Sequence, residues 1–256
     1  SSTLSEYYQS EAYISHTDSR RSFFDKVYQQ VKSFMLDRKL NWIEKESSGK
    51  GELLDIGAGT GDFLARAKKR GWSVTGMEPN EAARNLSSEK GIPLLKNSET
   101  LTSHSFDVIT MWHVLEHVPD LEKQISELHR LLKPGGILLI AVPNFKSYDA
   151  YKYKENWAAF DVPRHLWHFS RNSIEKIFGI FSFEVSKVEP LKFDSYYVSL
   201  LSEKYRSGSR NIFKGIWSGL LSNFVARRTR GPTWYCVATF SIISALVRSP
   251  SRYCAR

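Results

Sequence analysis

Cysteine is nearly absent from this chain of 256 residues. Cys236 and Cys254 are the only two, and both lie near the C-terminus. Neither a disulfide framework nor a four-cysteine zinc site can be built from them. We therefore expect a reducing, cytoplasmic setting.

Acidic side chains are missing from the C-terminal part of the sequence. No aspartate or glutamate follows Glu203, while ten lysines and arginines do. The net charge of +9 therefore arises in the tail, because residues 1–203 carry 26 basic and 27 acidic side chains. A neutral body gives no electrostatic reason for nucleic-acid binding. We do not expect a nucleic-acid partner, although the basic tail keeps that alternative open.

The sequence also has no visible secretion signal and no long hydrophobic run. Its first residues are polar and lack a basic region followed by an apolar one. The uncharged stretch from Thr233 to Val247 has 15 residues, fewer than the roughly 18 to 20 that cross a bilayer as a helix. We expect no membrane span there but a buried strand or helix, with an interfacial segment as the alternative.

The chain does contain a regular alternation of apolar runs and helical patterns. Strands of nearly continuous hydrophobicity separated by helices are typical of a parallel sheet that is covered on both faces. Strands are expected at residues 51–57, 72–78, 92–95, 106–111 and 137–143, and helices at 18–46 (opened by Asp18), 61–70, 80–90 and 120–132. We therefore predict a doubly wound α/β domain whose ligand lies at the C-terminal ends of the strands.

These patterns also suggest a division of the chain. We expect an N-terminal cap segment and helix over residues 1–49, a ligand-binding domain over 50–243, and a tail over 244–256 that is disordered or a non-native extension. Within the domain, the aromatic-rich stretch 144–169 is expected to be a functional loop. A helix over 170–179 with Ser170 as its cap, a strand over 181–188, a helical insert over 194–230 and a last strand over 233–243 should follow it.

The sharpest motif is a glycine turn at the end of the first predicted strand. Asp55, Gly57, Gly59 and Gly61 follow one another at every second position, and Glu78 ends the next predicted strand. Glycines allow backbone amides to approach a ligand, and a carboxylate at that place can accept both hydroxyls of a ribose. A nucleoside-containing cofactor is therefore expected. The dinucleotide spacing of glycines is absent, since Asp62 occupies its third position, and Asp55 would repel a pyrophosphate.

In these motifs the sequence resembles the class I S-adenosylmethionine-dependent methyltransferases, in particular the bacterial group that includes ubiquinone-biosynthesis O-methyltransferases. The matching segments, in order, are LLDIGAGTGDFL, GMEPN, FDVITMWHVLEHVPD and LLKPGGILLIAVPN. The resemblance implies a Rossmann-like sheet, S-adenosylmethionine as the cofactor and S-adenosylhomocysteine as the product. It implies cofactor contacts at Asp55, Gly57, Ala58, Gly59, Gly61, Glu78, Pro79, Asn80, Ser98, Glu99, Met111, Trp112 and His113.

Within that list the resemblance assigns different parts of the cofactor to different segments. The glycine turn should line the methionine portion, with Asp55 facing its ammonium directly or through water. Glu78 should hold the ribose. Pro79 and Asn80 should border the adenine, and Ser98 and Glu99 are assigned there provisionally, because their segment lacks the family's usual acidic-aliphatic pair. Met111, Trp112 and His113, at the end of the fourth strand, should lie beside the sulfonium.

Residues His113 to His117 spell H-x-x-E-H, a pattern that some zinc peptidases use. That use requires the motif on a helix with a further acidic ligand downstream. Here the motif follows a predicted strand and falls inside a methyltransferase motif. We therefore predict no metal site, with zinc or another divalent ion as the alternative.

The segment from Asp161 to Ser170 holds the candidates for acid–base chemistry. Similar P-R-H-x-x-H-F segments follow the fifth strand in many bacterial relatives, so the loop should close over the acceptor. Transfer to a hydroxyl needs a base, and histidine is suited to neutral pH. His165 is the first candidate and His168 the second; for either, the alternative is a structural hydrogen bond. Arg164 is expected to contact the acceptor.

Aromatic side chains could form a roof over a planar or sugar-like acceptor. Tyr8 and Trp157 are the first candidates for this role, with Tyr7, Tyr13 and Tyr148 beside them, although all of them could equally pack the N-terminal segment. We expect methyl transfer to a small molecule or glycan, most plausibly at oxygen. The alternatives are an RNA or protein methyltransferase and a non-catalytic nucleoside-binding module. Nothing in the sequence indicates an oligomeric state.

Overall fold

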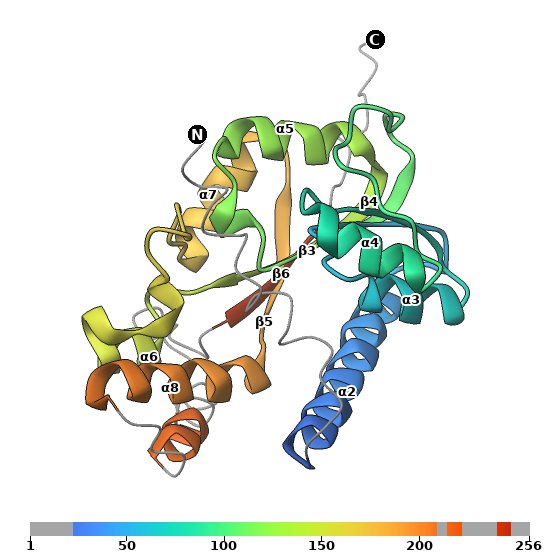
Figure 1. Cartoon of the computed structure of the whole chain (residues 1–256). Helices are drawn as coiled ribbons and strands as arrows, with labels where there is room; N and C mark the ends of the chain where they lie inside the picture. The colour runs from blue at the N-terminus through green and yellow to red at the C-terminus, as the bar shows by residue number, and fades with distance from the viewer. Residues whose placement is uncertain (1–22, 209–213, 222–239, 247–256) are drawn as a thin grey trace. The chain divides into compact units, whose positions relative to one another are not determined.

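The computed structural model describes residues 23–208, 214–221 and 240–246 (Figure 1). Its helices and strands alternate along the chain. In order, they are α2 (Phe23–Glu46), β1 (Glu52–Ile56), α3 (Asp62–Lys69), β2 (Ser73–Met77), α4 (Glu81–Glu89), β3 (Phe106–Trp112), the 3-10 helix η2 (Leu115–His117), α5 (Leu121–Leu131), β4 (Leu132–Pro143), α6 (Tyr148–Tyr153), the 3-10 helices η3 (Lys154–Asn156) and η4 (Ala158–Phe160), α7 (Arg171–Ile180), β5 (Glu184–Pro190), α8 (Lys192–Ser207) and β6 (Phe240–Leu246).

The strands form one sheet in the order β2-β1-β3-β4-β6-β5. The first four in this order form its parallel part, and β5 pairs antiparallel with β6. The predicted α/β alternation and parallel sheet are therefore confirmed. The described chain divides into two compact units, residues 23–110 with 130–137, and residues 111–129 with those from 138 onward, so that β3 and β4 each contribute to both.

In the first unit a buried strand pairs with its neighbour beneath a short helix. β1 is parallel to β2, with Leu54 opposite Thr75, and α3 packs on β2. The apolar face of α3 is buried. Gly76 in β2 has no room for a side chain, because an added Cβ would lie 2.3 Å from Leu64 and 2.4 Å from Leu94. A glycine at this position is what allows the helix to lie against the strand.

Ion pairs connect α2 to α3 in the same unit. Lys32 Nζ lies 2.7 Å from Asp62, and Arg70 lies 3.0 Å from both Asp37 and Glu44. All these side chains are partly exposed, so each pair contributes only about 0–1 kcal/mol. The pairs orient the long helix more than they stabilise it.

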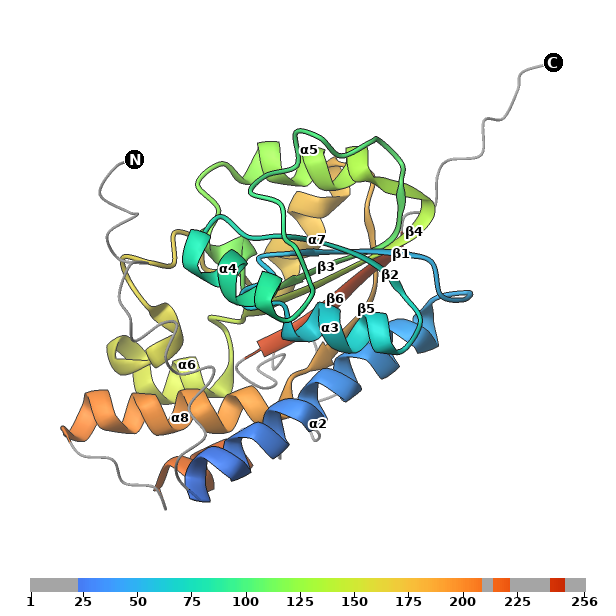
Figure 2. The same ribbon diagram turned by 45° about the vertical axis from the view of Figure 1, so that its right-hand side comes forward.

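The second unit contains the remaining helices. α6, η3 and η4 each pack against α8, and α6 and α8 run side by side in both views (Figures 1 and 2). α7 packs on β5. It begins at Ser170, whose hydroxyl accepts a hydrogen bond from the backbone of Ser173, as the sequence predicts. Residues 214–221 are also helical.

Several boundaries differ from the sequence-based expectations, and the expected loop over 144–169 contains α6, η3 and η4. The strand expected at 92–95 reduces to a single bridge between Leu95 and Met77. β4 begins at Leu132 and includes residues 133–136, which lie between the predicted helix over 120–132 and the predicted strand over 137–143. β6 extends to Leu246, three residues beyond the expected end of the domain. The proposed cap Asp18 lies outside the described residues, as does the first part of the expected last strand. No helix in the described part of the chain has the length and apolarity needed to cross a membrane.

Candidate functional site

The glycine turn of the first unit is fixed to the ends of two strands. Gly57, Gly59 and Gly61 all have positive φ, at 73°, 53° and 74°, a region that favours glycine. The amides of Gly57 and Ala58 donate to the carbonyl of Met77, at 2.8 and 2.9 Å. The end of β1 is thus held beside the end of β2, where the motif predicts a ligand.

Glu78 follows β2 and organises this turn. One carboxylate oxygen accepts a hydrogen bond from the amide of Gly59 at 2.9 Å, and the other from the amide of Asn80 at 3.0 Å. Asn80 in turn caps α4 by accepting from the amide of Ala83. Each carboxylate oxygen has a second lone pair, and the side chain is half-buried. Glu78 can therefore accept ribose hydroxyls while it holds the turn.

Asp55 lies beneath the turn, 2% exposed. Its carboxyl accepts a hydrogen bond from the Thr110 hydroxyl at 2.6 Å. Burial raises the pKa of Asp55 to about 7, and the Thr110 hydrogen bond opposes that rise. A cation placed beside this carboxyl would favour its ionised form, so the position suits a positively charged group of a ligand.

The turn leaves space on one side only. A Cβ added at Gly59 would have no atom within 4 Å, whereas one at Gly61 would lie 2.0 Å from the hydroxyl oxygen of Ser87. Gly61 is therefore required by packing against α4, and Gly59 borders open space. The open space and the Glu78 carboxylate fit an adenosyl cofactor, while the glycine amides donate within the protein and hold the turn in place.

The other residues expected at this site have mixed surroundings. Pro79 is exposed, and its carbonyl accepts from Arg84. Ser98 and Glu99 lie in the same unit, in a turned segment where Glu99 is exposed and its amide donates to Asn97. No side-chain contact brings these two residues to the glycine turn among the contacts that the described residues show, and their role stays a prediction.

In the second unit, Met111 and Trp112 end β3, and His113 follows it. Met111 is fully buried, while Trp112 and His113 are half-buried. The His113 ring lies between two carboxylates, with Nε2 3.3 Å from Asp194 and Nδ1 3.6 Å from Glu116. These neighbours raise its pKa to about 9 although burial opposes the rise. His113 is therefore an imidazolium near neutral pH and connects the start of α8 to the end of β3.

The segment from Asp161 to His168 folds back on η2. The amides of Leu166 and Trp167 donate to the backbone carbonyl of Glu116, at 2.8 and 3.2 Å. The Trp167 indole donates to the carbonyl of Val118 at 2.7 Å. These bonds place His165 beside His117, with ring centroids 4.6 Å apart.

The two candidate bases differ in their surroundings. His165 is largely buried, and its Nδ1 donates to the carbonyl of Ala159 at 2.9 Å. Burial lowers its pKa, and His117 adds to the lowering. His168 is exposed, and its Nε2 donates to the carbonyl of Phe160 at 3.0 Å. Arg164 pairs with Asp161 on the same segment.

One three-residue group in this unit has metal-ligating capacity. Glu116, His117 and His165 offer ligand atoms that all lie within 4.8 Å of one another. Two of these residues belong to the H-x-x-E-H pattern, for which the sequence predicts no metal site, with zinc or another divalent ion as the alternative. Asp194, which holds His113, could not be found from the sequence, because 81 positions separate the pair.

Of the two aromatic residues that are the first candidates to contact the acceptor, the structure describes Trp157. Trp157 is 1% exposed and packs edge-on against Phe160, so it contributes to the core of the second unit. A role beside an acceptor stays a prediction. Tyr8 lies outside the described residues.

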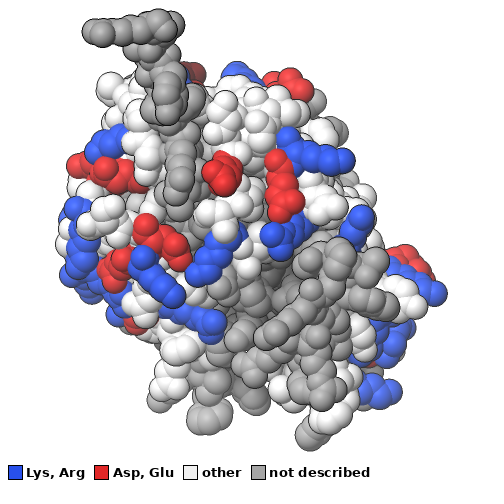
Figure 3. All heavy atoms as spheres, turned by 180° about the vertical axis from the view of Figure 1, so that it is seen from behind, with Lys and Arg blue, Asp and Glu red and all other residues white. Residues whose placement is uncertain are grey.

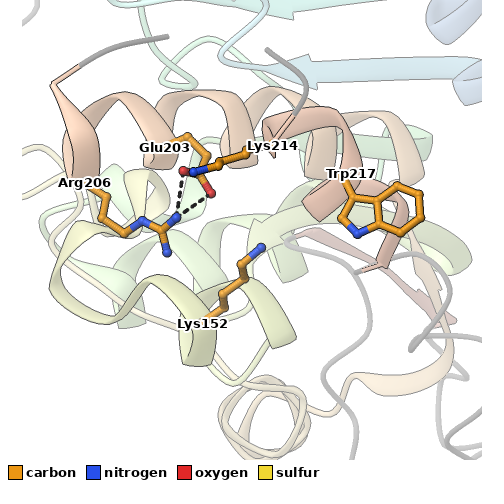
Figure 4. Close-up of a pocket in the computed structure, with 5 residues that line it drawn as sticks. All are labelled: Lys152, Glu203, Arg206, Lys214 and Trp217. Carbon is orange, nitrogen blue, oxygen red and sulfur yellow. Dashed lines mark hydrogen bonds and ion pairs between the residues drawn. The ribbon is translucent and has the colours of Figure 1, made fainter. Parts of the chain in front are cut away.

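The second unit also contains a cavity of about 410 Å³ (Figure 4). Its lining residues are Lys152, Glu203, Arg206, Lys214 and Trp217. Arg206 pairs with both oxygens of the buried Glu203, and Lys152 donates to Ser218. Arg206, Glu203 and Lys152 thus have partners within the protein, and the cavity by itself does not indicate a ligand.

Known proteins share sequence with this chain. A family described as a methyltransferase domain matches residues 27–188. The ubiquinone biosynthesis O-methyltransferase of Photorhabdus laumondii is 34% identical over 118 residues, which cover 41% of this chain and 49% of that protein. The chain thus spans about half the length of the curated relatives that it matches.

Solved structures are similar over most of the chain. A methyltransferase from Thermotoga maritima, described as a possible histamine N-methyltransferase, has a TM-score of 0.54 at 20% identity and covers 86% of this chain and 96% of that one. Geranyl diphosphate C-methyltransferase from Streptomyces coelicolor has a TM-score of 0.58 at 17% identity, over 90% and 83%. At these identities the likeness shows the fold, and the predicted Rossmann-like sheet is confirmed.

Proposed function

Since the chain belongs to the methyltransferase-domain family, we propose that it transfers a methyl group from S-adenosylmethionine to an oxygen atom of a small-molecule or glycan acceptor. The observation that carries this proposal is the Glu78 carboxylate bonded to the amide of Gly59 beside open space. A nucleoside with a free ribose matches these groups. The O-methyltransferase relatives support oxygen as the acceptor atom.

Each part of the glycine turn has a proposed role in holding the cofactor. The open side of the turn at Gly57, Ala58 and Gly59 receives the methionine portion, and Gly61 keeps the turn against α4. The buried carboxyl of Asp55 attracts the ammonium group of the methionine portion, because a carboxyl with a pKa of about 7 ionises when a cation lies beside it. When bound, S-adenosylmethionine supplies an electrophilic methyl group on its sulfonium sulfur.

The acceptor must lose a proton as it gains the methyl group. A bond forms between the acceptor oxygen and the methyl carbon while the carbon–sulfur bond breaks, and S-adenosylhomocysteine leaves. We assign the hydroxyl proton to His165. Its Nδ1 is engaged with Ala159, which leaves Nε2 as the basic nitrogen, and its lowered pKa keeps the ring neutral near pH 7. His168 is the second candidate.

Transfer of a labelled methyl group tests the function directly. Purified protein and S-adenosylmethionine carrying a tritiated methyl group would be incubated with phenols, catechols, sugars, RNA and a protein mixture. We expect label in a hydroxyl-bearing small molecule or a glycan. Label in RNA or protein alone would support the second candidate function, which the basic C-terminal residues favour. No transfer despite cofactor binding would leave a nucleoside-binding module.

Two single substitutions test the base. His165→Ala should lower kcat by about 100-fold or more and leave S-adenosylhomocysteine binding unchanged, while His168→Ala should have a smaller effect. Unchanged turnover in both variants on an identified acceptor would remove both histidines from the catalytic step.

A further inference from the structure

Three cationic side chains line the cavity of the second unit, and each comes from a different helix. Lys152 lies on α6, Arg206 on α8 and Lys214 on the helix over residues 214–221. Figure 4 shows their charged ends directed toward the same space. Among the described residues that line the cavity, Glu203 is the one acid. Three cations less one carboxylate leave the lining with an excess of two positive charges.

The Glu203 carboxylate is already engaged by groups of the protein. The side chain is buried and accepts hydrogen bonds from the Tyr153 hydroxyl at 3.0 Å and from Arg206 at 2.9 and 3.1 Å. The Tyr153 ring also holds two of the cations, since its centroid lies 5.2 Å from Lys152 Nζ and 5.7 Å from the Arg206 guanidinium carbon. Two positive charges thus share one ring and one carboxylate.

The Lys152 ammonium is partly removed from water at this cavity. Burial lowers its pKa, and the charges of Glu203 and Asp149 do not offset that lowering. The Arg206 charge adds to it. Its Nζ donates to the buried hydroxyl of Ser218 at 2.7 Å, although an ammonium has three protons to donate. An anion in the cavity would replace the hydration that burial has taken from this group.

Trp217 gives the cavity an aromatic wall whose position is fixed. The side chain lines the cavity and is 64% exposed (Figure 4). Its helix, residues 214–221, lies directly against α8, because a Cβ added at Gly215 would lie 2.6 Å from Leu200 and one at Gly219 would meet α8 as closely. Packing this close determines which side of the helix faces outward. The indole is therefore held in place for stacking on a planar or sugar ring.

We propose that this cavity binds a small ring-bearing molecule that carries a phosphate monoester. The phosphate would lie among Lys152, Arg206 and Lys214, with the ring against Trp217. A phosphate monoester carries about −1.5 to −2 charges at pH 7, which matches the positive excess of the lining. Lysine and arginine bind phosphate through charge-assisted hydrogen bonds. The cavity volume of about 410 Å³ lies within the usual range for small-molecule sites.

The site also narrows the proposed acceptor, and this use of it rests on the proposed function. The phosphate would hold the acceptor without reacting, while a hydroxyl of the same molecule gains the methyl group. Binding of the phosphate ester itself does not depend on methyl transfer.

Calorimetric titration of the whole chain with phenyl phosphate tests the site without relying on activity. Inorganic phosphate lacks the ring and phenyl β-glucoside lacks the charge, so both should bind roughly 10-fold or more weakly than phenyl phosphate. Lys152→Met and Trp217→Ala should each weaken phenyl phosphate binding by a similar factor. The matched control is Lys204→Met, which removes an exposed lysine of α8 that does not line the cavity and should leave the affinity unchanged.

The wild-type titrations decide the question even if a variant fails to fold. No saturable binding of phenyl phosphate, or inorganic phosphate or phenyl β-glucoside binding as tightly, would overturn the site. Unchanged affinity in folded Lys152→Met would do the same. S-adenosylhomocysteine binding, measured on the same samples, separates the two proposals. Cofactor binding without phenyl phosphate binding would leave the proposed function intact and remove the site. Phenyl phosphate binding without cofactor binding would do the reverse.

Discussion

Asp55 is a carboxyl group that the fold has removed from water beneath the glycine turn. Its pKa of about 7 lies far above its ordinary value of 3.8, because burial penalises the ionised form more than the Thr110 hydrogen bond favours it. Since the folded state holds this proton more tightly than the unfolded chain does, stability from this group is fully present below pH 4. It is lost as the pH rises through 7.

Asp55→Asn should remove that pH dependence. From the pKa difference, the wild type should lose as much as ~4 kcal/mol of folding free energy between pH 4 and pH 8.5 from this group. Urea unfolding at pH 5 and pH 8.5 should show a smaller difference in the variant. Asp107→Asn is the control, because Lys133 and the amide of Glu52 offset burial and lower the Asp107 pKa, so its titration lies below this window. Equal pH dependence in Asp55→Asn and wild type would contradict the account.

A second prediction at the scale of single residues concerns Glu78. Glu78→Gln replaces a charged acceptor of two amide hydrogen bonds with a neutral one and places an amide group beside a donor. Because hydrogen bonds to charged groups contribute about 1.5–3 kcal/mol, S-adenosylhomocysteine affinity should fall by roughly 10- to 100-fold. Calorimetry of Glu81→Gln, an exposed neighbour on α4, should match wild type. Equal affinity in Glu78→Gln would exclude Glu78 from the ribose site.

Which single residues could be predicted depends on how local their signal is. The spacing of Gly57, Gly59 and Glu78 along the sequence predicts that they lie at the ends of two adjacent strands. The structure has them there. His117 was visible in the H-x-x-E-H pattern, but its partner His165 belongs to another segment. That partnership depends on backbone bonds to Glu116 that no local pattern encodes.

At the scale of elements, the turn between β1 and α3 makes a paired prediction. Gly59 and Gly61 both have positive φ. Gly59→Ala and Gly61→Ala should therefore each lower the free energy of unfolding by about 1–2 kcal/mol. Gly61→Ala should cost about 1–3 kcal/mol more, because its Cβ meets the Ser87 hydroxyl, which is buried and donates to the carbonyl of Ile92. Gly59→Ala should instead weaken cofactor binding, since its Cβ enters the open space.

Urea unfolding and calorimetry on both variants separate these effects. Equal losses of stability, or unchanged S-adenosylhomocysteine affinity in Gly59→Ala, would show that the open side of the turn is not the cofactor site. The pair provides its own control, since both substitutions add the same methyl group to the same turn.

Element prediction succeeded where hydrophobic period and caps agreed. α7 begins after Ser170, with the side-chain cap that the sequence indicates, and α4 begins after Asn80, which the structure shows to be its cap. The expected strand at 92–95 became a single bridge, because Ile92 instead packs near Gly61 and its carbonyl accepts from Ser87. Tertiary contacts overrode a short apolar run there.

At the scale of the whole molecule, the position of charge bears on the acceptor. On the face shown in Figure 3, basic side chains lie beside acidic ones among the residues that the structure describes. A mixed surface gives no broad positive field to attract a phosphate backbone. This face, as far as the structure describes it, therefore adds no electrostatic support for an RNA acceptor.

The central claim is that the chain binds an S-adenosyl cofactor, and thermal unfolding tests it most directly. Tm would be measured with S-adenosylhomocysteine, S-adenosylmethionine and NAD, each far above its expected Kd. At about 100 times Kd, binding adds roughly 2.7 kcal/mol, which should raise Tm by roughly 5 °C for a domain of this size. The account predicts this shift with both sulfur ligands and none with NAD. A shift with NAD alone, or with none of the three, would contradict it.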